Sequence, residues 1–240
     1  MNYKKILFFT GSGISVESGL KTYRSKDGIW NNYKINDVAT KKAIYSNLNE
    51  VNHFFNMIRN NIKYSKPNKA HFIISDISKK IETKIITQNI DDLHERSGSK
   101  NVIHIHGSIF ESIDIKRKGS ILHQNNDIKE DEKNIENNIL IRPNIVLFNE
   151  NAFHIDESLK IIKESDLIII IGTSLSVEPA SNIIFENNKA TIIIIDIDKN
   201  ILNKIPKKLK KDINKRIFLY NDNSVNGLIK LKKEILKMEN

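Results

Sequence analysis

Two histidines end one of the apolar runs of the sequence, and a glycine follows them. His104 and His106 are separated by one residue, so their side chains lie on the same side of a strand. Such a pair can bind a metal, but no nearby Cys, Asp or Glu completes a recognisable ligand spacing. A histidine between a strand end and a glycine is better suited to act as a general base, because its pKa lies near neutral pH. We therefore expect His106 to be catalytic, and we expect no metal site.

A second polar group follows the apolar run that ends at Thr87. It contains Gln88, Asn89 and Asp91, directly ahead of a short helical pattern. Polar side chains at the carboxyl end of a parallel strand face the ligand crevice, where these three could bind an amide and a ribose. The alternative is that Asn89 or Asp91 only caps the following helix.

Glycines follow the first apolar run. Gly11 and Gly13 would let the backbone approach a pyrophosphate, and the next helix start would offer unpaired N–H groups. The third glycine of the dinucleotide fingerprint should stand at position 16, where this chain has Val16. The pattern therefore disfavours an ordinary dehydrogenase, and a tight turn without a ligand remains an alternative.

Small hydroxyl residues follow the most apolar run. Thr173 and Ser174, after Gly172, could bind the phosphates or ribose of a cofactor, and Pro179 suits a helix start. A serine hydrolase would need a G-x-S-x-G elbow, which the sequence lacks.

The elements that must position these residues are short apolar runs separated by helical patterns. Runs without polar alternation are typical of strands that are covered on both faces of a parallel sheet. Helical stripes over 70–81 and 225–236 supply crossovers. The pattern predicts an α/β fold with a Rossmann-like, doubly wound parallel sheet. The expected strands are 6–9, 84–87, 102–105, 145–148, 167–171, 191–195 and 216–220.

Two stretches interrupt this alternation. Residues 19–40 show no periodicity and predict a long functional loop, and the polar residues 111–138 predict a small insertion or mobile loop. We therefore expect a single catalytic unit, 1–240, in which a Rossmann-like large domain carries small-domain segments. The large domain is expected over about 1–30, 84–107 and 142–240, and the small one over about 31–83 and 108–141.

The composition narrows the class of protein. The 240 residues are 39% hydrophobic and 28% charged, which is normal for a soluble globular protein, and the absence of cysteine excludes disulfides, thiolate zinc sites and cysteine nucleophiles. No apolar run approaches the length of about 20 residues that spans a bilayer, so we expect a cytoplasmic protein without a membrane partner. The net charge of +9 is spread among Asn, Asp and Glu, which is typical of a solvated surface rather than a nucleic-acid-binding face. We expect a monomer without a nucleic-acid partner.

Taken together and in order, these clusters resemble the motifs of the sirtuin family. Those motifs read roughly G-A-G-I-S-x-x-S-G-I-P-x-F-R, T-Q-N-I-D-x-L-H, H-G, R-P-x-x-V-x-F-G-E and G-T-S-L-x-V-x-P-A. Here they stand at 11–24, 87–94, 106–107, 142–150 and 172–180, and so they span nearly the whole chain. The resemblance is to the compact bacterial members.

The resemblance implies an enzyme that uses NAD to remove acyl groups from protein lysines. In that family the acyl oxygen attacks the ribose carbon, nicotinamide leaves, and the histidine matching His106 then deprotonates the ribose. Lysine and O-acyl-ADP-ribose are the other products. The implied catalytic residues are His106, Asn89 and Asp91.

The resemblance also implies the binding residues. Those expected to hold NAD are Gly11, Ser12, Gly13, Ser15, Glu17, Tyr23, Arg24, Trp30, Gln88, Asn89, Ile90, Asp91, Gly172, Thr173, Ser174 and Asp196. Those expected to contact the acylated peptide are Phe55, Ile58, Val146, Phe148, Asn149 and Glu150, with 146–150 pairing with the peptide as an added strand.

The chain departs from the family in its zinc site. The family's zinc is held by two C-x-x-C pairs between the H-G and R-P motifs, but residues 108–141 contain no cysteine and offer only His123 as a soft ligand. Four ligands cannot be assembled, so we expect a zinc-independent small domain that folds by packing or stays mobile.

Other departures are single residues. The family's proline is Lys21 here, and its loop phenylalanine is Tyr23, which keeps the ring. Asn149 replaces a glycine and is expected to narrow or re-aim the peptide groove. Asp196 replaces an asparagine and can still accept hydrogen bonds from the adenosine ribose.

One departure concerns the acyl group. Members that remove succinyl groups carry Y-x-x-R in the helix after the cofactor loop, where Phe55 and Ile58 stand in this chain. Arg59 comes one residue later, about 100° around the helix. We therefore expect acetyl and other uncharged acyl groups as substrates.

Three functions remain open at this point. The first is a lysine deacylase, and the second is an NAD glycohydrolase or protein ADP-ribosyltransferase, because the same site cleaves the nicotinamide bond for other acceptors. The third is a nucleic-acid or regulatory binding module on an inactive scaffold. The retained catalytic residues disfavour the third, and Arg142, Pro143 and Phe148 indicate a peptide groove, which favours the first over the second.

Overall fold

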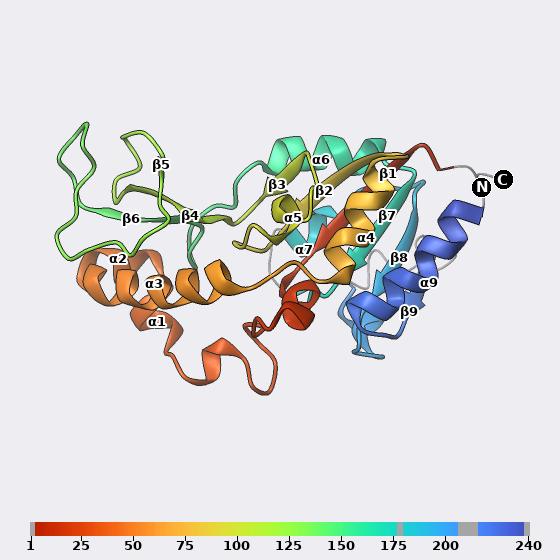
Figure 1. Ribbon diagram of the computed structural model, residues 1–240, viewed down its shortest axis with the longest axis horizontal. Helices are drawn as coiled ribbons and strands as arrows, with labels where there is room; N and C mark the ends of the chain where they lie inside the picture. Colours follow the sequence, from red (N-terminus) through yellow and green to blue (C-terminus); the bar gives the residue numbers. More distant parts are fainter. Residues whose placement is uncertain (1–2, 177–179, 206–215, 238–240) are drawn as a thin grey trace.

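Six parallel strands form the central sheet of the larger part of the molecule (Figure 1). The structure is a computed structural model that describes residues 3–176, 180–205 and 216–237. The strand order is β3-β2-β1-β7-β8-β9, so the winding reverses between β1 and β7, where such sheets bind their ligands. The bounds are β1 Lys5–Thr10, β2 Glu82–Thr87, β3 Val102–His104, β7 Leu167–Ile171, β8 Thr191–Ile195 and β9 Ile217–Tyr220.

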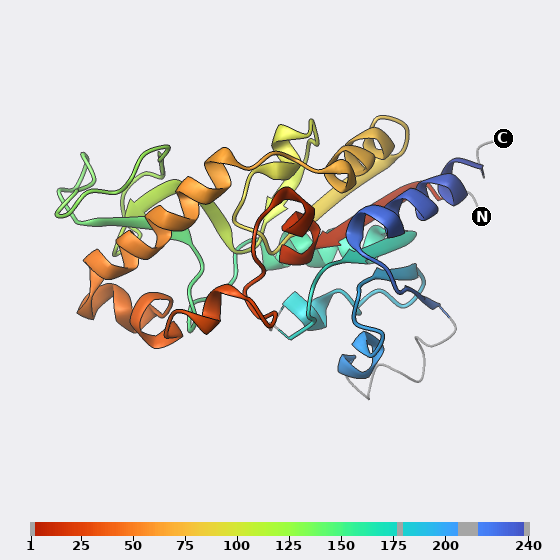
Figure 2. The ribbon, with the colours of Figure 1, turned by 60° about the horizontal axis from the view of Figure 1, so that its bottom comes forward.

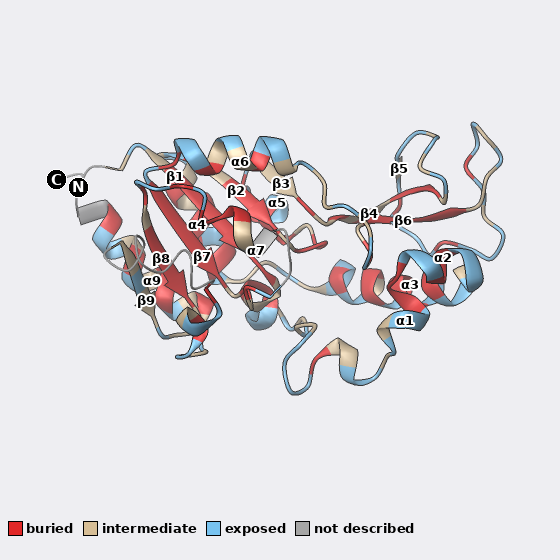
Figure 3. Cartoon of the chain, turned by 180° about the vertical axis from the view of Figure 1, so that it is seen from behind, coloured by how far each residue is buried: buried red, intermediate tan, exposed pale blue. Residues whose placement is uncertain are grey.

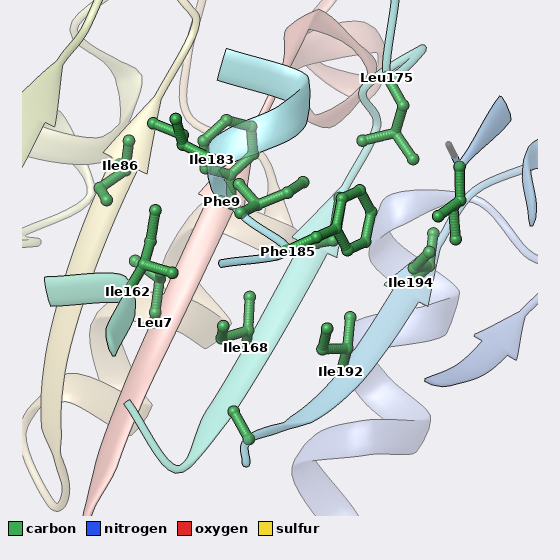
Figure 4. Packing of buried hydrophobic residues seen from close by; sticks show 14 of the residues in the cluster. Leu7, Phe9, Ile86, Ile162, Ile168, Leu175, Ile183, Phe185, Ile192 and Ile194 are labelled. Atoms are coloured by element: carbon green, nitrogen blue, oxygen red, sulfur yellow. The ribbon is translucent and has the colours of Figure 1, made fainter. Parts of the chain in front are cut away.

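Helices cover both faces of this sheet. They are α4 Lys69–Ser78, α6 Ile155–Glu164, α7 Ala180–Ile183 and α9 Ser224–Lys237. Leu7 and Phe9 of β1 pack with α6 and α7 (Figure 4), whereas Ile6 and Phe8 pack on the opposite face with α4 and α9. The central strand β7 is apolar throughout because it is buried on both sides. The predicted α/β, doubly wound, Rossmann-like sheet is confirmed.

The smaller part lies at the other end of the long axis in Figures 1 and 2, and we call it the small lobe. Its elements are α1 Ile35–Val38, α2 Lys41–Ser46, α3 Leu48–Tyr64, β4 Gly107–Asp114, β5 Leu122–His123 and β6 Ile141–Ile145. The strands form an antiparallel sheet in the order β5-β4-β6. Val51, Phe54 and Phe55 of α3 pack against Ile109 and Ile145 of that sheet, and Figure 3 shows the buried residues along α3 and β6.

A buried carboxylate organises the loops of the small lobe. Asp114 is fully buried, and it accepts hydrogen bonds from the backbone N–H groups of Lys116 (2.9 Å), Lys118 (2.9 Å) and Gly119 and from Asn137 Nδ2 (3.2 Å). Burial acts to raise the pKa of this carboxyl, but these hydrogen bonds outweigh burial and hold the pKa below its ordinary value. Among the residues described, no group of three or more His, Cys, Asp or Glu could hold a metal ion.

One expected strand lies elsewhere. Residues 145–148 do not join the parallel sheet, because the strand of this region is β6, Ile141–Ile145, which pairs antiparallel with β4. The apolar residues beyond it serve the small lobe and the cavity instead, since Leu147 is in the small-lobe core and Phe148 is half-exposed beside it. An apolar run of this length does not reveal which sheet it joins.

The boundary between the two parts also differs from the expected one. Helix α4 was expected in the small domain (31–83), but Ala70, Ile73, Ile74 and Ile77 pack on the large sheet. Its stripe faces β1 and β2 because it is the crossover that leads into β2. No helix in the described part of the chain is long and apolar enough to cross a membrane.

Candidate active site

A cavity of about 580 Å³ opens at the carboxyl ends of β1, β2, β7 and β8, where the sheet meets the small lobe. Twenty of the residues expected at the site line it, from both parts of the molecule. They are Gly11, Ser12, Gly13, Glu17, Tyr23, Arg24, Trp30, Phe55, Gln88, Asn89, Ile90, His106, Val146, Phe148, Asn149, Glu150, Gly172, Thr173, Ser174 and Asp196.

A second cavity of about 600 Å³ lies next to the first. Ser12, Tyr23, Asn89 and Ile90 line both, so the two cavities share a wall. The remaining expected residues line the second cavity: Ser15, Ile58 and Asp91. The expected acyl pocket of Phe55 and Ile58 is thus divided, because only Phe55 lines the first cavity.

His106 is held in one tautomer. Its Nδ1 lies 2.9 Å from the carbonyl oxygen of Gln88, which can only accept, so Nδ1 carries the proton and Nε2 of the neutral ring is the basic atom. Burial lowers the pKa of His106, the Gln88 carbonyl opposes this, and the charge of Arg24 lowers it further. The ring is therefore neutral at pH 7, as a general base must be.

Asn89 and Asp91 form a buried polar group with Ser15. Ser15 Oγ donates to Asp91 Oδ2 (3.0 Å), and Asn89 Nδ2 donates to Ser15 Oγ (3.2 Å). Burial raises the pKa of Asp91 to about 6, against the hydrogen bonds from the Leu93 N–H and Ser15. Asp91 Oδ1 also accepts from the Leu93 N–H (3.2 Å) at the start of α5, Leu93–Arg96, so the helix-capping alternative accounts for part of its role.

The glycines of the first loop pack against the loop after β7. A Cβ on Gly13 would lie 2.5 Å from Gly172 Cα, and Gly172 itself has φ +58°, a conformation that favours glycine. The N–H groups of Gly11 and Gly13 donate to Ile171 and Gly172 carbonyls (3.0 and 2.9 Å). These two donors are therefore used inside the protein, and the segment that follows is a 3₁₀ helix, Ser12–Ser18.

Polar contacts join the loops after β2 and β7. Thr173 Oγ1 donates to Gln88 Oε1 (2.6 Å), so two expected cofactor-binding residues hold each other in place. Ser174 hydrogen-bonds Ser176 through their hydroxyls (2.6 Å). Val177, Glu178 and Pro179 of the same motif lie outside the described residues.

Aromatic side chains connect the long loop to the small lobe. The ring centroids of Tyr23 and Trp30 are 5.3 Å apart, and those of Trp30 and Phe148 are 6.2 Å apart. The guanidinium carbon of Arg24 lies 5.8 Å from the centre of the Phe148 ring. The loop expected to cover a cofactor thus contacts the segment expected to bind a peptide.

The segment 146–150 is held from inside the small lobe. Phe148 forms a parallel bridge with Thr40, donating to the Ala39 carbonyl (2.9 Å) and accepting from the Lys41 N–H (3.0 Å). An added peptide strand would therefore pair through other groups of this segment. Asn149 has φ +69°, which asparagine adopts more readily than most residues, so it can stand where the family has glycine.

Glu150 positions this segment. Its Oε2 accepts from Arg142 Nη2 (2.8 Å) and from the Leu147 N–H (2.9 Å). Burial acts to raise the pKa of Glu150, but the hydrogen bond and charge of Arg142 outweigh burial and lower it. The expected substrate contact at Glu150 is thus also a fixed point of the loop.

Sequence reasoning missed several lining and supporting residues. Ala39, Asp198 and residues 222–224 line the first cavity, and no motif marks them. Asn68 donates through Nδ2 to the Ile14 carbonyl (2.7 Å) and to Ser18 Oγ (3.0 Å), and so supports the 3₁₀ helix from α4. Its side chain also caps α4, and an asparagine directly ahead of a helical stripe is the sequence signal that could have marked it.

Comparison with known proteins agrees with this geometry. The model of the Sir2 family matches residues 11–179. An NAD-dependent protein deacylase of Aggregatibacter actinomycetemcomitans is 38% identical over 192 residues, which are 80% of this chain and 92% of the relative. One of Helicobacter pylori strain J99 is 33% identical over 236 residues, 98% of this chain and 97% of the relative. A solved complex of a Sir2 homologue with ADP-ribose superposes with a TM-score of 0.87 at 28% identity, covering 99% of this chain and 94% of that one. The chain therefore belongs to the Sir2 family, as its motifs predicted.

Proposed function

We propose that this chain is an NAD-dependent deacylase of protein lysines. The observation that carries the proposal is His106, a neutral ring whose Nδ1 is fixed 2.9 Å from the Gln88 carbonyl and which lines the cavity between sheet and small lobe. A base at that place stands between the residues expected to hold the cofactor and those expected to hold the acyl-lysine.

The residues around the cavities fit NAD, which would supply nicotinamide as leaving group and an ADP-ribosyl unit as acyl acceptor. Asn89, Asp91 and Ser15 are buried polar groups next to the shared wall, and they suit a carboxamide and ribose hydroxyls. Asp196 lines the first cavity at the end of β8, where a carboxylate can accept from a ribose hydroxyl. Thr173 and Ser174 line the same cavity and offer hydroxyl groups there.

The chain's own residues then divide the chemistry. Asn89 and Asp91 orient the nicotinamide end and its ribose, so that the acyl oxygen meets the ribose carbon as the nicotinamide bond breaks. His106 Nε2 then takes a proton from a ribose hydroxyl, which makes that oxygen nucleophilic toward the acyl carbon. Trp30 and Phe148, whose rings are in contact beside the cavity, restrict the access of water until the acyl group has passed to the ribose. One water molecule is consumed as the lysine is released, and the products are nicotinamide, the free lysine and O-acyl-ADP-ribose.

The acyl group is proposed to be uncharged, as in acetyl-lysine. Phe55, Leu147 and Phe148 line the first cavity from the small lobe and present apolar surface. An alkyl chain gains about 0.8 kcal/mol for each CH₂ that it buries on such a surface. A carboxylate buried there without a partner would be strongly disfavoured.

The experiment is mass spectrometry of an acetyl-lysine peptide incubated with the purified protein, with and without NAD. We expect loss of the acetyl group only with NAD, together with O-acetyl-ADP-ribose. ADP-ribose alone would identify a glycohydrolase instead, and an ADP-ribosylated peptide would identify a transferase.

We also propose that the protein is a monomer in the cytoplasm, with acylated proteins as partners and without a nucleic-acid partner. Light scattering during size-exclusion chromatography tests the oligomeric state.

A further inference from the structure

His104 lies directly against the loop that carries Asn89 and Asp91. It is the last residue of β3, opposite Thr87 in the parallel pair of β3 with β2. Its Nδ1 is 2.9 Å from the carbonyl oxygen of Asn89, and its Nε2 is 2.8 Å from Glu95 Oε1. A carbonyl oxygen and a carboxylate both accept, so both ring nitrogens must donate, which only the imidazolium can do.

His104 and His106 therefore hold consecutive carbonyl groups of one loop, in different protonation states. His106 donates to Gln88 and must keep Nε2 free of a proton to act as a base, whereas His104 donates to Asn89 and needs both protons. Glu95 belongs to α5, beyond the loop, so the His104 ring connects the two ends of the segment 89–95.

The segment fixed in this way contains buried groups that have little room to move. Asn89 and Asp91 are 4% and 5% exposed, and both contact Ser15. A small shift of the Asn89 backbone would therefore displace both side chains from the wall that the two cavities share.

We propose that the charged His104 ring, bound between the Asn89 carbonyl and Glu95, positions Asn89 and Asp91 for the reaction, and that its loss of a proton sets the alkaline limit of activity. The inference rests on the proposed function. His104 is a positioning residue, because its contacts are with the loop and not with the reacting atoms.

The charges around the ring agree with this assignment. Burial lowers the pKa of His104, but the hydrogen bond and charge of Glu95, the Asn89 carbonyl and the charge of Asp91 together raise it above its ordinary value. His94, the other histidine beside the ring, is neutral, because burial and the charge of His104 hold its pKa well below the ordinary range.

The sign of the pH effect follows from these states. His104 is charged below its raised pKa and loses the second donor as the pH rises through it, so activity should fall on the alkaline side. On the acid side, His106 must lose its proton and Asp91, with a pKa of about 6, must ionise, so activity should rise there. The result is a bell-shaped profile.

The test compares pH profiles of kcat/KM for wild type, Glu95→Gln and His104→Asn, with His53→Asn on the exposed side of α3 as control. Glu95→Gln removes the carboxylate, so the alkaline limb should move to lower pH while the acid limb stays. His104→Asn keeps one donor near Nδ1 but lacks the second donor to Glu95 and does not titrate, so activity should be reduced at all pH values and the alkaline limb should disappear. His104→Leu removes the donor, and kcat should fall on the order of 10- to 100-fold.

The protonation state is also measured directly, by ¹⁵N NMR of the imidazole nitrogens, with His104→Asn identifying the resonances. We expect His104 to titrate above 6.5 in wild type and at lower pH in Glu95→Gln. A neutral His104 at pH 6, or an alkaline limb that is the same in all variants, would overturn the inference. A wild type that deacylates no peptide would overturn the proposed function instead, while the NMR titration would still decide the state of the ring.

Discussion

Arg59 Nε donates to the Ile109 carbonyl at 2.9 Å, and this bond turns the guanidinium of α3 into the core of the small lobe. Arg59 is fully buried, and a second nitrogen of its guanidinium group donates to Asn56 Oδ1. It lines neither cavity that bears on the site. The residue that could have met a charged acyl group is thus committed to the fold.

The acyl preference follows from this placement. Acetyl- and butyryl-lysine should be turned over at least about tenfold better than succinyl-lysine in the same peptide, because a distal carboxylate would be buried without a partner. Comparing kcat/KM for the three peptides measures this. A succinyl value equal to the acetyl value would mean that Arg24, which lines the cavity, reaches the acyl group.

His106→Ala should lower deacylation by about 10²–10⁴-fold, the usual effect of losing a general base, and leave NAD affinity close to that of wild type. Calorimetric titration with NAD and steady-state kinetics separate the two effects. His53→Ala, on the exposed side of α3, is the control and should keep full activity. Deacylation by His106→Ala at the rate of this control would remove His106 from the mechanism.

Protein stability should fall at mildly acid pH because His71 is buried in the neutral state. Burial lowers its pKa from 6.5 to about 4, against the weak opposing charge of Glu95. Between these values the unfolded chain binds a proton that the folded one does not, so stability is lost as the pH falls from about 6.5 to 4. The shift corresponds to about 3 kcal/mol in the free energy of unfolding.

Urea unfolding at a series of pH values measures this slope. In the wild type, Nδ1 of His71 accepts a hydrogen bond from the Asn68 N–H at 3.2 Å. His71→Asn keeps an oxygen that can accept this bond but does not titrate, so the variant should flatten the slope of stability against pH below pH 6.5. The buried His94 contributes in the same direction, so part of the slope should remain. An unchanged slope in His71→Asn would show that His71 is protonated in the folded state.

The small lobe should be insensitive to chelators, since a structural zinc site needs about four ligands and residues 108–141 contain no cysteine. Stoichiometric zinc in the purified protein, lost together with activity, would contradict this account.

Asp114→Asn should destabilise the protein by about 2 kcal/mol, because the hydrogen bonds that are lost are to a charged acceptor. Asp127→Asn, in an exposed loop with a single hydrogen bond to Asn60, is the matched control.

The sequence predicted the large sheet well and the small lobe poorly, for physical reasons. A run such as 167–171 must be a buried strand, because few other places in a protein accept continuous apolar residues. Residues 145–148 are equally apolar, yet their sheet is decided by the pairing of β6 with β4, which lies in long-range contacts. The loops after β4 depend on Asp114, a single carboxylate that has no distinctive sequence signal.

The same contrast holds at the site. His106, Asn89 and Gly172 line the cavity, and their place there could be predicted because each follows a strand whose end must face the crevice. The sequence could not predict that Phe55 and Ile58 line different cavities. Two residues three apart on a helix lie on the same face, but the surrounding loops decide which cavity each one lines. The role of His104 depends on Glu95 and the Asn89 carbonyl, which only the folded loop brings to its two nitrogens.

The most direct test of the central claim is the release of nicotinamide from NAD by the purified protein, measured with an acetyl-lysine peptide, with the same peptide carrying unmodified lysine, and without peptide. A lysine deacylase should release nicotinamide in step with deacetylated peptide, and only with the acetylated peptide. Release at equal rates in all three reactions would contradict the account and identify an enzyme that cleaves NAD without using acyl-lysine.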